Sequence, residues 1–197
     1  MFLKRFEELA SSVRGCVYTI ETTLASQEMA LEKAYQIISN VQCNQGVVFV
    51  IGNGGSAGIA SHFSNDLMKA LQISSQTLYD TNLLTCLAND IGYENIFSYP
   101  LDKYIKKNDA LVAISSSGNS PNIVNAAKVA VAKEASVITL TGFQATNKLR
   151  PYGHLNFWID RSDYGLVETA HFFLLHTLVD LWQKRNLSKD IDLCPSR

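Results

Sequence analysis

The stretch VVFVIGNGGSAGIASHFSNDL, residues 47–67, decides the fold class that this sequence predicts. Residues 47–51 form an apolar run of β-branched and aromatic side chains, which is typical of a strand covered on both faces. Residues 52–56 interrupt this run with glycine, asparagine and serine, and a helical pattern follows them. A strand, a turn of small residues and a helix in this order indicate one unit of an α/β sheet.

Four further apolar runs have the same character, and helical patterns separate them. Strands that alternate with helices predict an α/β fold, a doubly wound, flavodoxin-like domain with a parallel sheet flanked by helices. The expected strands are residues 47–51, 76–79, 110–115, 136–140 and 155–159, and the expected helices are residues 56–70, 82–105, 120–133 and 164–185.

The segment before the first strand predicts two extra helices over residues 4–44, broken near Ser26. Apolar residues recur there at spacings of three and four, which is the helical period. We expect residues 1–45 to form a helical pair that packs on the domain or builds an oligomer interface. A single domain then spans residues 46–186, and residues 187–197 form a loose tail. The apolar positions of the first expected helix are Leu9, Val13, Val17, Ile20 and Leu24.

The composition excludes several classes of protein. The 197 residues include 17 Lys and Arg against 18 Asp and Glu, and this balance argues against a nucleic-acid partner. The four cysteines are far apart and form no CxxC pair, so we expect neither a thiolate metal site nor a disulfide framework. The first residues lack the apolar core of a signal peptide, and no apolar run approaches the ~20 residues of a membrane span. We therefore expect a soluble, cytoplasmic protein.

Two loops of small residues follow predicted strands at the edge of the sheet where α/β proteins bind ligands. One is GNGGS, residues 52–56, and the other is SSSGNS, residues 115–120, with Pro121 favoured in the first turn of the next helix. Glycine lets backbone N–H groups approach a ligand, serine adds hydroxyl donors, and a helix N-terminus favours an anion. The two loops together predict a phosphate site, and the alternative is two tight turns without a ligand.

Dinucleotide binding is a further possibility for the first loop alone. Residues 52–57, GNGGSA, have Ala57 where GxGxxG has its third glycine, which such sites accept. A dehydrogenase of this kind leaves the serine-rich loop unexplained. The sequence has no GKS or GKT, so it contains no P-loop.

His62 and Asp66 lie four residues apart on the predicted helix 56–70 and therefore share one face. A histidine and a carboxylate at this spacing ligate a divalent metal, form an acid–base pair or make a plain surface contact. The last predicted helix carries Glu168, His171 and His176 within an apolar run. His171 is one turn from Glu168, and local geometry therefore favours these two residues as a pair. His176 is eight residues from Glu168, roughly 12 Å along the axis. Glu168 and His176 share a site only if their side chains converge, or they serve sites in different subunits.

Several motifs together resemble the sugar isomerase (SIS) domain family and, within it, the phosphoheptose isomerases. The resemblance covers nearly the whole chain. The motifs are GNGGS at 52–56 with the following His62, LANDIGYENIF at 87–97, ISSSGNSPN at 114–122, ITLTG at 138–142, and the helix that contains His176. The resemblance implies a five-stranded parallel sheet and a homotetramer with active sites between subunits. It also implies conversion of sedoheptulose 7-phosphate to D-glycero-D-manno-heptose 7-phosphate.

The resemblance assigns roles to individual residues. Contacts to the substrate would come from Asn53, Gly54, Gly55, Asn89, Asp90 and Glu168, and the phosphate would be held by Ser115, Ser116, Ser117 and Ser120. One zinc ion per subunit would have His62, Asp66, Glu168 and His176 as ligands. The family pattern has Glu where this chain has Asp66, and Gln where it has Glu168. The activity that the resemblance implies therefore depends on two positions at which this chain differs from the family pattern.

Isomerisation of an aldose and a ketose moves a proton between two carbons through an enediol. It requires a base, an acid or metal at the oxygen, and an anchor for the phosphate. Asp66 or Glu168 is the expected base, and His176 is the expected acid or a zinc ligand beside His62. The alternative is a non-catalytic SIS domain that senses a phosphosugar or serves as a protein-interaction scaffold.

Overall fold

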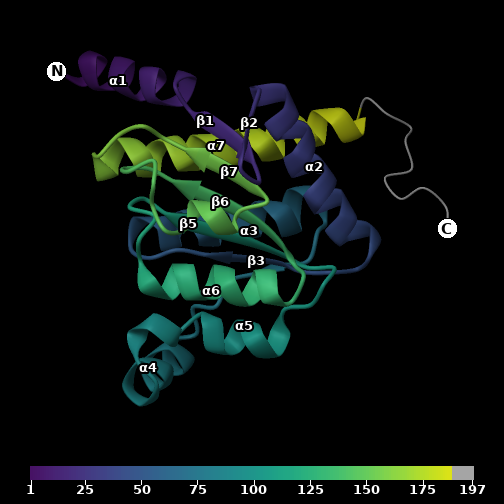
Figure 1. Ribbon diagram of the computed structural model, residues 1–197. Coiled ribbons are helices and arrows are strands. Elements are labelled where there is room, and N and C mark those ends of the chain that lie inside the picture. The colour runs from purple at the N-terminus through teal and green to yellow at the C-terminus, as the bar shows by residue number, and fades with distance from the viewer. Residues whose placement is uncertain (188–197) are drawn as a thin grey trace.

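The structure is a computed structural model that describes residues 1–187 (Figure 1). The predicted loose tail therefore lies outside the described residues, except for residue 187 at the end of the last helix. The elements in order are α1 (Phe2–Arg14), β1 (Val17–Ile20), β2 (Thr23–Ala25), α2 (Gln27–Cys43), β3 (Val48–Ile51), α3 (Gly55–Leu71), β4 (Ser75–Gln76), α4 (Thr81–Asp90), η1 (Tyr93–Asn95), α5 (Ser98–Tyr104), β5 (Ala110–Ser115), α6 (Pro121–Ala132), β6 (Ser136–Thr141), η2 (Arg150–Tyr152), β7 (Leu155–Trp158) and α7 (Tyr164–Leu187).

A single sheet of seven strands in the order β2-β1-β7-β6-β5-β3-β4 forms the centre of the molecule. The five strands from β7 to β4 are parallel, which confirms the predicted α/β class, although the strand predicted over residues 76–79 is the shorter β4 at Ser75–Gln76. β1 and β2 extend this sheet as an antiparallel pair beside β7. No helix among residues 1–187 is both long enough and apolar enough to cross a membrane.

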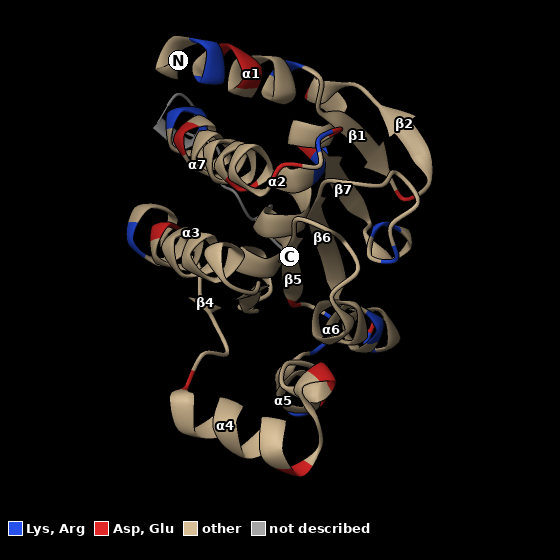
Figure 2. Cartoon of the chain, turned by 90° about the vertical axis from the view of Figure 1, so that its left-hand side faces the viewer, with Lys and Arg blue, Asp and Glu red and all other residues tan. Residues whose placement is uncertain are grey.

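Helices cover both faces of the parallel strands, as the end-on view shows (Figure 2). Successive residues of β3 point to opposite faces, so Val48 and Val50 pack with α2, α3 and α7, whereas Phe49 and Ile51 pack with α4, α5 and α6. Every residue of β3 and β5 is buried. Burial on both faces is the physical reason that these strands are continuous apolar runs in the sequence.

The predicted N-terminal helical pair is wrong between residues 15 and 25. Val17 and Ile20 lie in β1 and Leu24 in β2, so a β-hairpin separates α1 from α2. β1 pairs with β7, with Ile20 opposite Leu155. Val17–Ile20 is rich in β-branched and aromatic residues, and the open edge of β7 offers them a partner strand. Pairing with a distant strand therefore overrides an apolar spacing that also fits a helix.

The single helix predicted over residues 82–105 is also wrong, because it is divided into α4, η1 and α5. Gly92, between α4 and η1, has φ +90°. This conformation is one that residues with a side chain rarely adopt, and it ends the helical path.

Asn156 of β7 fastens the hairpin to the parallel sheet. It is almost fully buried, and its side-chain oxygen accepts a hydrogen bond from the Thr139 hydroxyl of β6. Its Nδ2 donates to Thr19 Oγ1 of β1 at 3.1 Å and to the Gly153 carbonyl at 3.0 Å. One buried amide thus connects three neighbouring strands and the turn before β7.

We expect Asn156→Ala to lower the free energy of unfolding by about 2–4 kcal/mol, because the Thr139 hydroxyl and the Gly153 carbonyl lose a buried partner. Urea unfolding measures this change. Asn82→Ala on the exposed side of α4 is the matched control and should change stability by less than about 0.5 kcal/mol. Equal effects of the two substitutions would contradict the role of Asn156.

Candidate active site

The first loop leaves β3 and enters α3 with its backbone fixed by a tyrosine. Gly52 N–H donates to Tyr79 Oη at 2.7 Å, and the Tyr79 hydroxyl donates to the Gly52 carbonyl at 3.0 Å. α3 then begins at Gly55, so the unpaired N–H groups of its first turn lie at the edge of the sheet. The first predicted ligand loop thus lies at the edge of the sheet where the sequence places a phosphate site.

The second loop leaves β5 and enters α6 in the same way. Ser120 is the N-cap of α6, and Ser115 Oγ donates to Ser120 Oγ at 3.4 Å. Ser116 Oγ is buried and has no hydrogen-bond partner among the described residues. A buried hydroxyl without a partner is costly, so this group is available to a ligand.

The two loops meet in one pocket, because β3 and β5 are adjacent parallel strands whose ends lie side by side. The pocket has a volume of about 270 Å³. Two helix N-termini and several serines surround it, and none of the lining residues in the described part of the chain is a lysine or an arginine. An anion would therefore be bound by backbone N–H groups and hydroxyls rather than by side-chain cations. The lining residues are Asn53, Gly54, Gly55, Ser56, Ile114, Ser115, Ser116, Ser117, Ser120, Tyr164 and Glu168.

Glu168 brings a carboxylate into this pocket from the first turns of α7. The carboxylate lies against Gly55, and a Cβ at that position would collide with it. The absence of a side chain at residue 55 therefore lets a carboxylate approach the N-terminus of α3. The positive end of the α3 helix dipole therefore lies next to this carboxylate.

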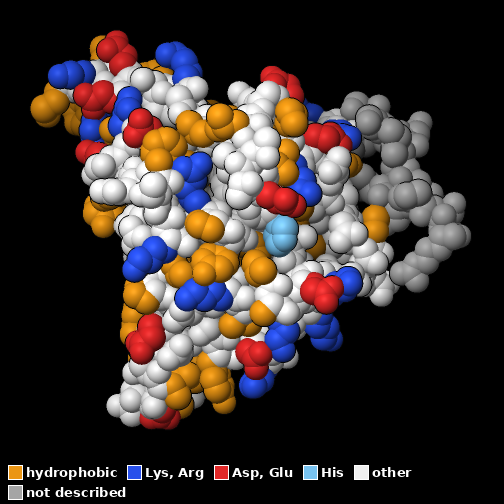
Figure 3. Space-filling view, viewed as in Figure 1, with side chains coloured by type: hydrophobic (Ala, Val, Ile, Leu, Met, Phe, Trp, Pro, Cys, Tyr) orange, Lys and Arg blue, Asp and Glu red, His pale blue; other side chains and the backbone are white. Residues whose placement is uncertain are grey.

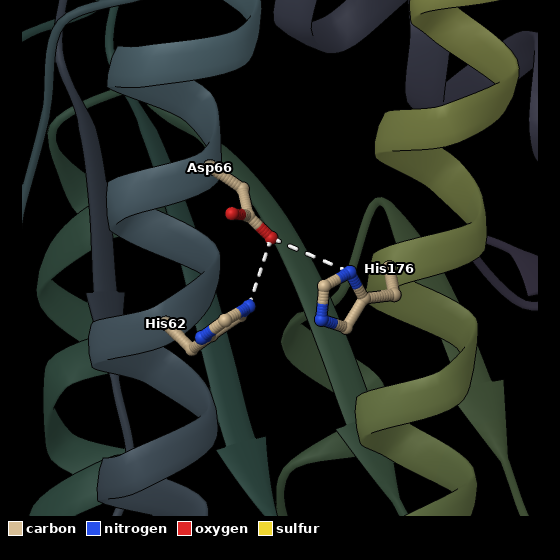
Figure 4. A group of neighbouring side chains, drawn as sticks. All are labelled: His62, Asp66 and His176. Atoms are coloured by element: carbon tan, nitrogen blue, oxygen red, sulfur yellow. Dashed lines mark ion pairs between the residues drawn. The ribbon is translucent and has the colours of Figure 1, made fainter.

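His62, Asp66 and His176 form a second group between α3 and α7 (Figure 4). Asp66 Oδ2 lies 3.2 Å from His62 Nε2 and 3.5 Å from His176 Nδ1. The two imidazole rings have centroids 4.6 Å apart. The side chains of His62 and His176 are 46% and 41% exposed, so a solute can reach all three ligand atoms. We call these residues the His–Asp–His group.

The donor set of the His–Asp–His group fits a metal ion. Two imidazole nitrogens and one carboxylate oxygen lie within 4.8 Å of one another. Asp66 Oδ2 is 3.2 Å from one histidine nitrogen and 3.5 Å from the other, so the three side chains would be able to hold one zinc ion, for which imidazole and carboxylate are usual ligands. Three protein ligands leave a fourth position open, as in catalytic zinc sites.

Glu168, the fourth predicted zinc ligand, is not part of this group within one chain. It lies two turns from His176 on α7, about 12 Å along the helix axis, and lines the pocket instead. Asn89 and Asp90, at the end of α4, also lie outside the pocket lining. Asn89 Nδ2 donates to Asp90 Oδ1 at 2.8 Å, and this hydrogen bond lowers the pKa of the Asp90 carboxyl.

His171 does not pair with Glu168, although the two lie one turn apart. Its ring is fully buried, and Nε2 lies 3.1 Å from the Thr141 carbonyl, which can only accept. Nε2 therefore carries the hydrogen, and Nδ1 has no partner among the described residues. Burial lowers the pKa of His171 to about 4, so the ring is neutral at pH 7 and serves the core.

Residues 14–142 match the SIS domain, and the chain belongs to the SIS domain family. Among curated relatives, the phosphoheptose isomerase of Campylobacter concisus (strain 13826) is 34% identical over 155 residues, covering 76% of this chain and 82% of that protein. A phosphoheptose isomerase of Helicobacter pylori (strain Shi470) is 31% identical over 182 residues, covering 87% of this chain and 92% of that protein.

Solved structures agree with this family assignment. The phosphoheptose isomerase from Neisseria gonorrhoeae has a TM-score of 0.78 at 27% identity, covering 91% of this chain and 96% of that chain. A phosphoheptose isomerase from Francisella tularensis, 24% identical, shares the fold with a TM-score of 0.79, covering 93% of this chain and 96% of that chain. The resemblance that the sequence motifs indicated is confirmed.

Sequence reasoning missed several residues of the site. Ser56, Ile114 and Tyr164 line the pocket, and Tyr93 and Asn122 bind Asn53. Asn122 is the last residue of the motif ISSSGNSPN, but the sequence does not indicate that it contacts Asn53. Tyr93 likewise lies within the motif LANDIGYENIF, whereas Tyr164 carries no local signal, because exposed tyrosines are common at helix ends.

The buried His171 predicts a loss of stability in acid. Its pKa is about 4 in the folded protein and about 6.5 when unfolded, so between these values only the unfolded state binds the proton. The stability from the neutral ring is fully present above pH 6.5 and falls by about 3 kcal/mol as the pH drops to 4.

Urea unfolding at pH 7.5 and pH 4.5 tests this prediction in the wild type and in His171→Gln. Glutamine can still donate to the Thr141 carbonyl but does not titrate. We expect the variant to lose about 2–3 kcal/mol less stability than the wild type between the two pH values. The same loss in both proteins would show that His171 does not titrate on unfolding.

Proposed function

We propose that this chain is an aldose–ketose isomerase that converts sedoheptulose 7-phosphate to D-glycero-D-manno-heptose 7-phosphate. The observation that carries the proposal is the alignment of two sites along α3 and α7. An anion pocket lies at the N-terminal ends of these helices, and the His–Asp–His group lies further along them. The relatives named above, all phosphoheptose isomerases, support the choice of substrate.

The phosphate would bind in the serine loop, at the N-terminus of α6. Ser115, Ser116 and Ser120 offer hydroxyls there, and Ser116 Oγ lacks any other partner among residues 1–187. The negative charge of Glu168 keeps the phosphate on the serine side of the pocket. Glu168 is then placed to accept hydrogen bonds from sugar hydroxyls.

An open seven-carbon sugar phosphate with ~1.5 Å bonds extends about 10 Å from its phosphorus to C1. Glu168, which lines the pocket, and His176 of the His–Asp–His group are about 12 Å apart along the axis of α7. A substrate of this length would extend from the pocket toward the His–Asp–His group. With its phosphate in the serine loop, the substrate would place C1 and C2 beside the His–Asp–His group.

The proton transfer would then fall to Asp66. Its Oδ2 faces both histidines, and its other carboxylate oxygen points away from them (Figure 4). Asp66 would move the proton between C1 and C2, and the nearby histidines would stabilise the charge that develops on the oxygen. His62, Asp66 and His176 would hold zinc, which would supply Lewis-acid polarisation of the carbonyl oxygen.

The remaining expectations concern assembly and location. The side chains of Phe2, Leu3 and Phe6 on α1 are exposed. Hydrophobic side chains are visible at the upper left of the space-filling view, where α1 lies in Figure 1 (Figure 3). Three large apolar side chains on one helix favour burial against another protein surface. They support the proposal of a homotetramer with sites between subunits. A cytoplasmic location is proposed from the sequence alone.

The decisive experiment supplies purified protein with sedoheptulose 7-phosphate and follows the aldose phosphate by NMR. We expect conversion that a chelator abolishes and zinc restores. Conversion that does not depend on zinc would support the proposed isomerase activity and contradict the proposed role of the metal. Saturable binding without conversion would favour the alternative function, a phosphosugar sensor, and the absence of both would refute the substrate.

The two carboxylates should respond differently to neutralisation. Asp66→Asn removes the proposed base, and we expect kcat to fall by about 10²–10⁴-fold. Glu168→Gln keeps hydrogen-bonding capacity and removes a charge near the phosphate, so KM should fall by about 2–10-fold while kcat changes little. Steady-state kinetics measure both values.

Asp180→Asn is the matched control for these two variants, because Asp180 lies on the exposed side of α7. It should leave both kinetic constants within about 2-fold of the wild type. A large loss of kcat in Glu168→Gln with none in Asp66→Asn would show that Glu168, and not Asp66, is the base.

A further inference from the structure

Asn53 of the first loop is held by a closed set of hydrogen bonds. Its Nδ2 donates to Asn122 Oδ1 at 2.9 Å, and Asn122 Nδ2 donates back to Asn53 Oδ1 at 2.9 Å. Tyr93 Oη lies 3.2 Å from the same Asn53 Oδ1 and donates to it. We call Asn53, Asn122 and Tyr93 the amide clamp.

A backbone N–H fixes the orientation of this clamp. Two facing amides satisfy each other equally well if both are turned over, so the pair alone does not set its direction. However, Ile123 N–H donates to Asn122 Oδ1 at 3.0 Å, and an amide NH₂ cannot accept that bond. The first turn of α6 therefore fixes Asn122, which is almost fully buried, and Asn122 in turn fixes Asn53.

The fixed orientation leaves one donor of Asn53 unused. Both lone pairs of Oδ1 are occupied by Asn122 and Tyr93, and one hydrogen of Nδ2 is given to Asn122. The second Nδ2 hydrogen has no acceptor among residues 1–187, and Asn53 lines the pocket. The clamp thus presents a donor to a ligand and shields the acceptor.

We propose that Asn122 and Tyr93 are positioning residues that lock Asn53 as a hydrogen-bond donor to an oxygen of the bound sugar phosphate. This inference rests on the proposed function and adds residues to the same site. The clamp also joins three parts of the chain, because Asn53 follows β3, Asn122 belongs to α6 and Tyr93 belongs to η1. Through Tyr93, η1 would therefore help to fix the orientation of the Asn53 side chain.

A double-mutant cycle tests whether Asn122 acts through Asn53. Asn53→Ala removes the donor, and Asn122→Asp places two acceptor oxygens face to face in either orientation of the Asn53 amide. We expect each single variant to lower kcat/KM by about 10–100-fold, and the double variant to fall no further than Asn53→Ala alone. The dissociation constant for sedoheptulose 7-phosphate, measured by calorimetry, should follow the same pattern.

Tyr93→Phe provides a second test on an exposed residue, where loss of folding is not expected. Removal of one hydroxyl that shields the acceptor should lower kcat/KM by about 3–10-fold. Tyr99→Phe, also exposed, is its control. Lys128→Gln on the exposed side of α6 changes the net charge as Asn122→Asp does and controls for that charge.

The outcomes separate this inference from the proposed function. Wild-type conversion with a non-additive cycle supports the clamp. Wild-type conversion with effects that multiply in the double variant overturns the clamp and keeps the isomerase. Control variants that lose as much activity as the clamp variants also overturn it. Wild-type protein that neither binds nor converts the sugar phosphate overturns both.

Discussion

The parallel pairing of β3 with β5 is the constraint on which the rest of the site depends. Val48 lies opposite Ala110 and Ile51 opposite Ala113, so both strands end at one edge of the sheet. The glycine loop and the serine loop, separated by about sixty residues of sequence, therefore become neighbours. α3 and α6 begin at this edge and direct their unpaired N–H groups to the same place. Among residues 1–187, no lysine or arginine lines this pocket, so an anion would be bound there by backbone N–H groups and hydroxyls.

The packing of α3 beside α7 divides the chemistry into two positions. Glu168 comes from the first turns of α7 and reaches the start of α3, where Gly55 makes room for it. His176 comes from further along α7 and meets His62 and Asp66. Asp66 is shorter than the glutamate of the family pattern, and it still contacts both histidines. The packing of α3 beside α7 thus brings the His–Asp–His group together even though its carboxylate is one methylene shorter.

Buried polar groups give this α/β domain its specific geometry. Asn156 fastens the hairpin to the sheet, Asn122 holds Asn53, and His171 donates to the end of β6. A polar group removed from water is costly unless it is paired, so each of these residues favours one arrangement over others. Apolar packing alone would not distinguish among those arrangements as strongly.

The sequence by itself determined the α/β class, the five parallel strands and the two ligand loops. These features are local, because an apolar run, a glycine turn or a serine-rich turn is visible within a few residues. The shared helical face of His62 and Asp66 is local for the same reason. The sequence also carried the motifs by which the SIS domain family was recognised.

Only the tertiary structure decided the remaining features. Residues 17–25 form a hairpin because β7 offers them an edge, and His171 pairs with Thr141 because β6 packs against α7. The separation of Glu168 from the His–Asp–His group, and the partner of Asn122, follow from how α3, α6 and α7 pack on the sheet. Each of these outcomes depends on a contact between residues far apart in the chain, and the spacing of residues within one segment cannot specify such a contact.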